Sequence, residues 1–381
     1  MKTILFLCES LGIGGAEKAL YTLLSHIDKS VYRITVCTLC DIGYYSDLVK
    51  KIPNIKYHSI LNPSESWFKS SLYKLRYLLI YRILSPKLIY KFFIPKNNDI
   101  EIAFCEGFST KILANSNNKS SKKIAWVHTD LLKNNWPISI GVYKTLTDEI
   151  LSYSRYDRIV GVSNSVTNNL NKLFKHKFNV QTIYNLIDVL EINKLAKVNP
   201  IIKQDISTFN IVSVGRLEYV KGYDRLITVC ARLILDDNIN ITLTIVGDGN
   251  EYKNLSEQIK RLSLENRVQL VGVKNNPYPY ILNADLYVCP SRQEGYNLAL
   301  AEAIILGKPC ASTNCSGPDE ILDNGRFGML VDNDDIKLYE ALKFILRTPS
   351  FLQELKEKAI ERTNFFSVKK NIDSFYQLIE S

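Results

Sequence analysis

The chain has 381 residues, which is enough for two domains with separate cores. Its net charge of +9 suits acidic small molecules, anionic lipid or nucleic acid and does not choose among them. The eight cysteines are scattered without a repeated metal-ligand spacing, so we expect reduced core residues. The apolar run at residues 3–8 is too short for a signal peptide, and no run approaches about 20 apolar residues, so we expect a cytoplasmic location or the inner face of a membrane.

Short apolar runs alternate with helical patterns along the whole chain. Predicted strands of the first half lie at residues 3–8, 33–39, 55–60, 100–105, 123–127 and 158–162. Predicted strands of the second half lie at residues 210–214, 241–246, 268–271, 284–289, 309–312 and 328–331. Alternation of this kind predicts parallel sheets that helices cover on both faces.

The two series are separated by residues 186–208, which contain Pro200 and no long apolar run, and which we interpret as a linker. We therefore predict an α/β fold with two Rossmann-like, doubly wound domains facing a central cleft. The predicted domains are residues 1–188 and 189–363. The amphipathic helical pattern at about residues 364–381 is expected to pack back on the first domain.

Residues 67–96 do not fit a simple strand–helix unit, because they combine seven basic side chains with many aromatic and leucine side chains and contain no acid. This composition is typical of an interfacial helix on anionic lipid. The alternative is a helix that packs its apolar side in the domain and leaves its charges in water. Nothing in the segment matches a module that reads nucleic-acid grooves, so we expect no nucleic-acid partner. The basic residues are Lys69, Lys74, Arg76, Arg82, Lys87, Lys91 and Lys96.

The stretch that follows the predicted strand at 284–289 contains two acids near a helix start. Glu294 is expected in the strand-to-helix loop and Glu302 about two turns into the helix, with Asn297 as the N-cap. A helix start at the carboxyl end of a parallel strand suits a phosphate. Carboxylates beside it are suited to accept hydrogen bonds from hydroxyls of a sugar or a ribose. The alternative is that both acids are solvated surface residues.

Neighbouring predicted loops carry complementary groups. Arg216 and Lys221 stand at a strand end and a helix entry, and a guanidinium with an ammonium suits a diphosphate, although a surface Arg and Lys is the alternative. Gly247 ends the next strand and permits close backbone approach. Backbone groups near Val273 and Lys274 could bind a base edge.

In this order the motifs resemble those of retaining nucleotide-sugar glycosyltransferases of the GT-B fold, in particular glycosyltransferase family 4. The resemblance covers essentially the whole chain, and it is strongest at residues 211–330 and weakest at residues 67–123. The matching motifs are Gly14-Gly15-Ala16-Glu17, Gly215-Arg216-Leu217 with Lys221-Gly222, Val246-Gly247-Asp248-Gly249, Glu294 with Glu302, and Ser316-Gly317-Pro318 with Glu320.

The resemblance implies a role for each matching residue. Arg216 and Lys221 would hold the donor diphosphate and offset the charge that develops on the leaving nucleotide. Glu294 would accept from donor-sugar hydroxyls, and Glu302 would accept from ribose hydroxyls. The remaining implied donor contacts are Gly14, Gly15, Gly215, Gly247, Val273, Lys274, Tyr296, Asn297 and Leu298.

His128 ends a predicted strand of the first domain, where the family places a His near the donor sugar. A His that is satisfied by structural contacts is the alternative, and front-face attack in retaining enzymes of this fold would require no general base here. Asp332-Asn333-Asp334 fits the Asp-x-Asp spacing of metal-dependent glycosyltransferases. We interpret it as a helix cap and expect neither a metal nor another cofactor.

The function hypothesis is a hexosyltransferase that moves a hexose or N-acetylhexosamine from a UDP-sugar to a saccharide, with retention. Residues 67–96 suggest a lipid-linked acceptor and a peripheral position on the inner membrane face, as in the biosynthesis of capsule, lipopolysaccharide or a related polysaccharide. An NAD-dependent oxidoreductase is one alternative, because Gly12-x-Gly14 and Asp41 suit a dinucleotide, but Glu17 replaces the third fingerprint glycine. A non-catalytic module that binds a sugar nucleotide or lipid is the other alternative.

Overall fold

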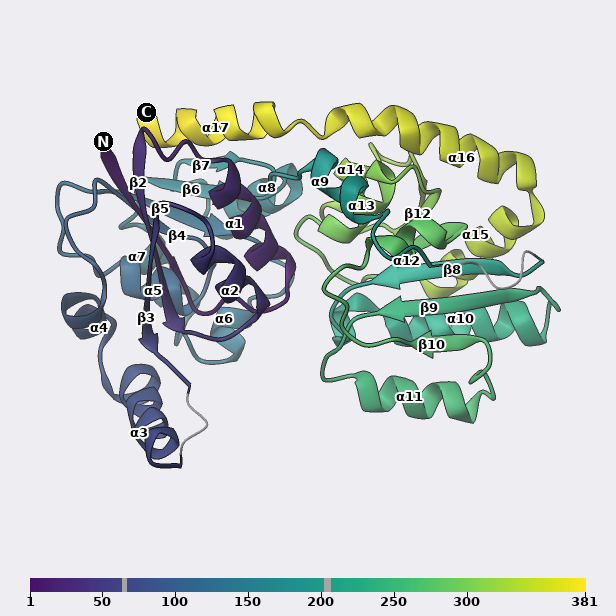
Figure 1. The fold of residues 1–381 in the computed structure, drawn as a ribbon, viewed down its shortest axis with the longest axis horizontal. Coiled ribbons are helices and arrows are strands. Elements are labelled where there is room, and N and C mark those ends of the chain that lie inside the picture. Colours follow the sequence, from purple (N-terminus) through teal and green to yellow (C-terminus); the bar gives the residue numbers. More distant parts are fainter. Residues whose placement is uncertain (64–66, 202–206) are drawn as a thin grey trace. The chain divides into compact units, whose positions relative to one another are not determined.

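The computed structural model describes residues 1–63, 67–201 and 207–381. The chain forms two compact units (Figure 1): unit 1 comprises Met1–Leu186 with Lys369–Ser381, and unit 2 comprises Ile187–Val368. The sequence predicted that the first domain ends at residue 188 and that the chain returns to it from about residue 364. Each unit is built on one parallel sheet, so the predicted α/β class with two Rossmann-like domains is confirmed.

Unit 1 has a seven-stranded sheet in the order β3-β2-β1-β4-β5-β6-β7, with every neighbouring pair parallel. The sequence predicted the first six strands and missed β7, which has three residues and lacks a buried apolar run. The strands are β1 (Lys2–Cys8), β2 (Tyr32–Cys40), β3 (Ile55–Leu61), β4 (Ile100–Ala103), β5 (Lys122–Val127), β6 (Arg158–Gly161) and β7 (Val180–Thr182).

Alternate side chains of β1 serve the two faces of this sheet. Leu5 and Leu7 pack into a cluster formed with η1, α4 and α5. Phe6 points to the opposite face, where its ring stacks against Phe375 of α17 with 6.2 Å between centroids. The helices of unit 1 are α1 (Gly15–His26), α2 (Tyr44–Lys50), α3 (Trp67–Leu78), the π-helical η1 (Leu79–Ile83), α4 (Pro86–Phe93), α5 (Phe108–Leu113), α6 (Trp136–Ser139), α7 (Leu146–Tyr153), α8 (Asn164–Leu173) and α17 (Val368–Glu380).

Unit 2 has a six-stranded parallel sheet in the order β10-β9-β8-β11-β12-β13, and all six strands were predicted. They are β8 (Phe209–Val214), β9 (Ile241–Val246), β10 (Val268–Leu270), β11 (Leu286–Cys289), β12 (Cys310–Thr313) and β13 (Met329–Val331). The helices are α9 (Val189–Leu195), the 3₁₀ helix η2 (Tyr219–Lys221), α10 (Tyr223–Leu235), α11 (Tyr252–Arg261), α12 (Tyr278–Asn283), α13 (Leu298–Ile305), α14 (Pro318–Ile321), α15 (Asp335–Arg347), α16 (Pro349–Arg362) and the 3₁₀ helix η3 (Thr363–Phe365).

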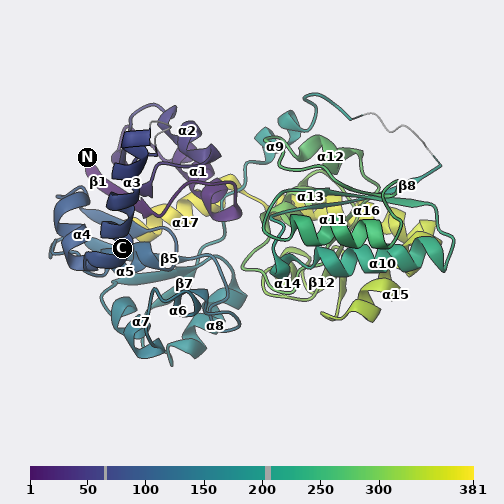
Figure 2. The same cartoon turned by 90° about the horizontal axis from the view of Figure 1, so that it is seen from below.

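A large hydrophobic cluster of unit 2 lies between its sheet and the helices on one face. Helices α10 and α11 lie side by side (Figure 2), and their apolar residues join those of α15 in one buried cluster with the strands. Burial of this kind contributes roughly 1.5–3 kcal/mol for each large apolar side chain. The predicted reduced state of the cysteines also agrees with the structure, since all eight are free thiols.

The predicted linker at 186–208 is wrong in part, because α9 lies within it. Asp188 caps this helix by accepting a hydrogen bond from the Glu191 N–H at 2.9 Å. The Asn276 side-chain amide donates to the Leu195 carbonyl at 2.8 Å, which attaches α9 to unit 2. The sequence signal was weak because the helix has seven residues and buries one of them, Ile192. Residues 202–206 of the predicted linker lie outside the described residues.

Candidate functional site

The strand order of unit 2 reverses between β8 and β11, the first and fourth strands of its sheet. In open parallel sheets, ligands bind outside the carboxyl ends of the strands at such a reversal. The loop after β8 leads through Arg216 to Lys221, and the loop after β11 carries Glu294. The fold therefore brings these predicted site residues to one edge of the sheet.

Lys221 and Glu294 form the central contact at this edge. The Lys221 ammonium donates to both carboxylate oxygens of Glu294, at 2.7 and 2.8 Å. The Ser291 hydroxyl at 2.6 Å and the Asn297 amide at 2.9 Å also donate to the carboxylate. Because the Glu294 side chain is 6% exposed, the interpretation of Glu294 as a solvated surface residue is wrong.

Arg216 and Lys221 differ in their surroundings. The Lys221 side chain is largely covered. It packs beside Gly215, since a Cβ placed on that glycine would lie 3.9 Å from the Lys221 Cδ and Cε atoms. Arg216 is exposed. An ammonium has three N–H donors, and the two oxygens of the Glu294 carboxylate accept from at most two of them. Lys221 therefore retains one donor for a further acceptor while it holds Glu294.

Asn297 is the N-cap of α13, as predicted. Its side-chain oxygen accepts a hydrogen bond from the Leu300 N–H at 2.9 Å, while its amide nitrogen donates to Glu294. The backbone of Asn297 is left-handed with φ of 61°, a conformation that Asn tolerates better than most residues. Tyr296, which precedes it, is buried, and Leu298 is the first helical residue. One side chain thus links the start of the helix to the carboxylate.

Glu302 lies on α13 and is 3% exposed, so its interpretation as a solvated residue is also wrong. The helix begins at Leu298, which places Glu302 a little over one turn from its start and not two turns. A buried carboxylate requires compensating partners. Its burial supports a role inside the unit, and its contact with a ribose stays a prediction.

Gly215 and Gly247 follow β8 and β9 at the same edge. A Cβ at Gly247 would overlap the carbonyl oxygen of Gly215, and a Cβ at Gly215 would lie 2.7 Å from the Tyr223 hydroxyl. Both residues have positive φ, 158° at Gly215 and 150° at Gly247. These glycines therefore allow the two loops to pack against each other, which is a structural reason besides the predicted approach of a ligand.

Val273 and Lys274 follow β10, the strand beside β9, and both are exposed. Gly272, which precedes them, has φ of 73° and turns the chain at the strand end. The Lys274 ammonium lies 6.0 Å from the centroid of the Tyr280 ring. These two predicted base-contact residues thus lie at the same sheet edge as the loops after β8 and β9.

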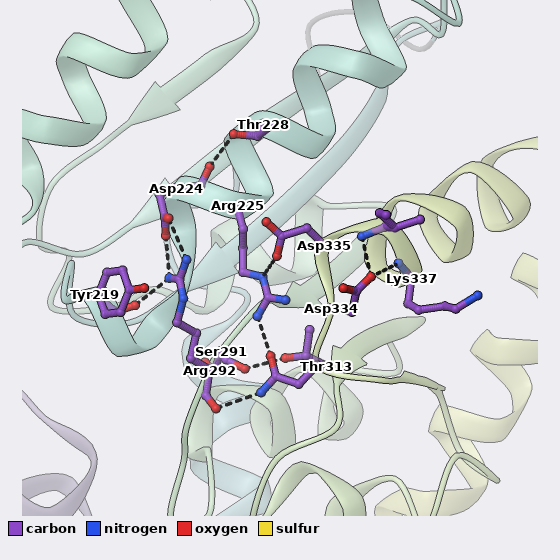
Figure 3. Close-up of polar contacts among 12 residues, drawn as sticks. Tyr219, Asp224, Arg225, Thr228, Ser291, Arg292, Thr313, Asp334, Asp335 and Lys337 are labelled. Carbon is purple, nitrogen blue, oxygen red and sulfur yellow. Dashed lines mark hydrogen bonds and ion pairs between the residues drawn. The ribbon is translucent and has the colours of Figure 1, made fainter. Parts of the chain in front are cut away.

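Asp332-Asn333-Asp334 caps a helix, as predicted. Asp334 accepts hydrogen bonds from the Ile336 and Lys337 N–H groups at the start of α15, at 2.8 and 3.0 Å (Figure 3). Across residues 1–63, 67–201 and 207–381, no group of three or more His, Cys, Asp or Glu side chains has the arrangement of a metal site.

His128 follows β5 in unit 1, and its ring packs on Phe104 with centroids 4.9 Å apart. Burial lowers the pKa of His128 to about 4, although the Glu106 carboxylate and a hydrogen bond with the Phe104 backbone act in the opposite direction. The imidazole is therefore neutral near pH 7. Its Nε2 atom is buried and has no hydrogen-bond partner in the described part of the chain. His128 is thus not a fully satisfied structural histidine.

Glu106 supports the His128 loop and was missed by the sequence analysis. This carboxylate is 3% exposed and accepts from the His128 N–H at 2.8 Å, the Thr129 hydroxyl at 2.6 Å and the Trp136 indole at 3.3 Å. Glu9 lies nearby, since it accepts from the Phe108 N–H at 3.0 Å. Glu9 follows β1 and Glu106 follows β4, the two strands between which the order of unit 1 reverses. An acid directly after each apolar run was the available signal.

Gly14 and Gly15 lie at the start of α1, with Gly14 as the N-cap in an extended conformation. A Cβ at Gly14 would overlap the carboxylate of Glu17. The glycine thus leaves room for the Glu17 side chain beside the first turn of the helix. The predicted approach of these two glycines to a diphosphate stays a prediction.

In sequence and in fold, the chain is similar to known sugar-transferring enzymes. Residues 200–362 match the family model described as "Glycosyl transferases group 1". Over 95% of this chain and 94% of the relative, the sequence is 27% identical to N-acetylgalactosamine-N,N'-diacetylbacillosaminyl-diphospho-undecaprenol 4-alpha-N-acetylgalactosaminyltransferase of Campylobacter jejuni.

Two solved structures share the whole fold. Anabaena HepE in complex with UDP and glucose aligns over 100% of both chains with a TM-score of 0.75 and 19% identity. Sucrose-phosphate synthase from Thermosynechococcus elongatus aligns over 100% of this chain and 98% of the other, with a TM-score of 0.77 and 16% identity. Residues 200–362 therefore resemble the group 1 glycosyltransferases, and the chain has the GT-B fold.

Proposed function

We propose that this chain is a retaining family 4 hexosyltransferase that moves a hexose or N-acetylhexosamine from a UDP-sugar to a lipid-linked saccharide. The proposal rests on the Lys221–Glu294 pair at the strand-order reversal of unit 2, beside the start of α13. The name of the Campylobacter relative specifies a diphospho-undecaprenol acceptor, and the Anabaena structure contains UDP and glucose. The product would be a capsule, a lipopolysaccharide or a related surface polysaccharide.

The proposed chemistry places charge where the leaving nucleotide develops it. The third donor of Lys221, together with the exposed guanidinium of Arg216, would hold the donor diphosphate. Preorganised donors of this kind commonly supply the largest single contribution to catalysis. Glu294 is held by Lys221, Ser291 and Asn297, and its Oε2 atom, which accepts from Lys221 alone of these three, would also accept from a donor-sugar hydroxyl.

The other assignments follow the same logic. Glu302 would bind the ribose hydroxyls, and backbone groups at Tyr296, Asn297 and Leu298 would bind the sugar and phosphate. Val273 and Lys274 would contact the base, and Gly215 and Gly247 would permit close approach. In unit 1 we assign Gly14 and Gly15 to the diphosphate and His128 to the donor sugar. No metal or other cofactor is part of the proposed reaction.

The test is transfer from radiolabelled UDP-sugars to acceptors in a membrane extract, with a UDP-release screen over UDP-glucose, UDP-galactose and their N-acetyl counterparts. Glu294→Gln and Lys221→Met should each lower turnover by about a hundredfold or more. Lys337 and Glu340 supply the control, because they form an exposed pair of 2.9 Å in the same unit. Lys337→Met and Glu340→Gln should retain wild-type rates. A wild-type protein without transfer, or full activity in both site variants, would reject the proposal.

We also propose that residues 67–96 place the enzyme on anionic lipid at the inner face of the cell membrane. Part of this segment packs in unit 1, since Ile80, Ile89 and Tyr90 are buried in its core. Its other side is exposed and mixes large apolar groups with cations. The exposed apolar residues are Leu72, Leu75, Tyr77, Leu78, Ile83, Leu88, Phe92 and Phe93. The exposed cations are Lys74, Arg76, Arg82, Lys87, Lys91 and Lys96.

This composition favours lipid over a merely solvated helix. Each cation near an anionic bilayer contributes roughly 1 kcal/mol, and the exposed aromatic rings suit the headgroup region. Among the described residues, no helix is both long and apolar enough to span a bilayer. We therefore propose attachment at the surface and assign no other macromolecular partner.

Co-sedimentation with vesicles tests this attachment. The protein should bind vesicles of phosphatidylcholine with phosphatidylglycerol and release them at high salt. Reversing two charges of α4, in Lys87→Glu/Lys91→Glu, should weaken binding about tenfold or more. The same reversal on exposed residues of α11, in Lys253→Glu/Lys260→Glu, is the control. Equal binding by the α4 variant and the wild type would contradict the proposal.

The NAD-dependent oxidoreductase is the weaker alternative. Asp41, its ribose candidate, pairs with Lys50 at 2.7 Å and accepts from the hydroxyls of Ser46 and Tyr57. This carboxylate therefore already serves contacts within unit 1. The other alternative is a non-catalytic module that binds a sugar nucleotide or a lipid. The transfer assay separates it from our proposal, because such a module would show no transfer.

A further inference from the structure

Arg292 lies two residues before Glu294, and the structure gives its guanidinium a defined set of partners. Two of its nitrogens donate to the two carboxylate oxygens of Asp224, each at 2.7 Å (Figure 3). One of them also donates to the Tyr219 carbonyl at 2.8 Å. The guanidinium carbon lies 4.0 Å from the centroid of the Tyr219 ring. Forked pairing combined with ring stacking fixes the orientation of an arginine.

The backbone of Arg292 is held as well. Its N–H donates to the Val220 carbonyl at 2.7 Å, so both the backbone and the side chain of Arg292 contact η2, the turn that ends in Lys221. On the other side, the Asn333 amide donates to the Arg292 carbonyl at 2.8 Å. The loop that carries Glu294 is thus hydrogen-bonded to η2, the turn that carries Lys221. These hydrogen bonds lie close in sequence to both Lys221 and Glu294.

A second arginine completes the network from the interior of unit 2. Arg225 is 4% exposed and donates to Asn333 at 2.5 Å and to Asp335 at 2.7 Å (Figure 3). Asn333 in turn holds the Arg292 carbonyl. The backbone carbonyl of Arg292 is therefore connected, through Asn333, to a buried arginine. This connection distinguishes it from an isolated surface ion pair, which contributes little.

We infer that Arg292, with Asp224 and Tyr219, is a positioning element that sets the Lys221 ammonium against the Glu294 carboxylate. The inference rests on the proposed function and deepens it. Arg292 gives its donors to Asp224 and Tyr219, so its effect on the reaction passes through Lys221 and Glu294. Small displacements of a catalytic group, even when their origin is remote, can cost up to about a hundredfold in rate.

The test compares Arg292→Gln with the wild type in the UDP-release assay. We expect kcat to fall about tenfold while the KM for the UDP-sugar changes less than about threefold, because the lost alignment acts mainly on charge that develops in the transition state. Arg292→Lys keeps the charge without the fork and should recover part of the rate. Asp224→Asn should reproduce the loss.

Arg232 provides the matched control, since its guanidinium stacks on the Tyr339 ring at 3.9 Å in the same unit. Arg232→Gln removes a stack of the same kind and should leave kcat unchanged. The decisive measurement is Arg292→Gln made in the Lys221→Met background. If Arg292 acts through Lys221, the second substitution should lower the residual rate less than about twofold.

The outcomes separate the two proposals. No UDP-sugar turnover by the wild type would reject the proposed function and this inference with it. Wild-type turnover together with an unchanged Arg292→Gln kcat would overturn the inference alone. A full, additive loss in the Lys221→Met background would also overturn it, because Arg292 would then act independently. A lower melting temperature in Arg292→Gln, with kcat per folded molecule unchanged, would show a purely structural role and likewise overturn it.

Discussion

Glu149 of unit 1 provides a prediction whose size follows from the structure. This carboxyl group lies on α7 and is fully buried, and its Oε2 atom accepts from the Asn135 amide at 2.5 Å. Its Oε1 atom has no partner in the described part of the chain. Asn135 also caps α6, in the segment that follows His128. Burial raises the pKa of Glu149 from 4.5 to about 7, although the Asn135 hydrogen bond acts in the opposite direction.

The sign of the effect on stability follows from where the proton is held. Below about pH 4.5 the group is protonated in both states and costs nothing. Between about pH 4.5 and about pH 7 the unfolded chain loses the proton while the folded chain keeps it, so the free energy of unfolding decreases as pH rises. Above this window the full cost is reached. The shift from 4.5 to about 7 corresponds to about 3 kcal/mol.

The perturbation is Glu149→Gln, which cannot ionise. The new amide nitrogen replaces a buried oxygen that has no partner, and this penalty does not depend on pH. The difference in unfolding free energy between variant and wild type should therefore move in favour of the variant by about 2.5 kcal/mol from about pH 5 to about pH 8. This corresponds to about 5–10 °C in melting temperature for a unit of this size.

Urea titrations and thermal melts at several pH values provide the measurement. The pKa of His128 is lowered to about 4 by burial, but this contribution is present in both proteins and cancels in the difference. Asp148→Asn is the control for a general loss of charge, because Asp148 lies on the same helix with its side chain 39% exposed. Stability curves for Glu149→Gln and the wild type that stay parallel between about pH 5 and about pH 8 would refute the reasoning.

Two further predictions concern unit 2. A double-mutant cycle of Lys221→Met and Glu294→Gln, followed by urea unfolding, should give a coupling energy of about 1–3 kcal/mol, because the two side chains are only 21% and 6% exposed. The same cycle on the exposed Lys337–Glu340 pair should give a smaller coupling energy. Equal coupling energies for the two pairs would contradict the structure. Gly247→Ala should destabilise the protein by about 1–3 kcal/mol, since the new Cβ would overlap the Gly215 carbonyl and residue 247 has a φ of 150°. An unchanged unfolding midpoint would count against this packing.

The sequence was informative wherever a signal is local. Apolar runs bounded by turn residues predicted twelve of the thirteen strands found in the described residues, and a side-chain oxygen before an apolar helix predicted the Asn297 cap. Strand β7 was missed because it has only three residues, and helix α9 was missed because it buries only one residue. Both patterns are too short to stand out in the sequence. The motif pattern also predicted which residues gather at the sheet edge of unit 2. It assigned them ligand roles and did not predict how they bind one another.

Pairing is set by strand order, which no local pattern contains. Lys221 and Glu294 are 73 positions apart and meet because β8 and β11 are neighbours in the sheet. A doubly wound sheet makes its first and fourth strands neighbours, so this rule, applied consistently, predicts a contact between the loops that follow them. Applied to unit 1, it pairs the loops after β1 and β4 and would have identified Glu9 and Glu106. Neither acid was predicted as a site residue. In a fold of this kind, the side chains that follow strands one and four are best considered together.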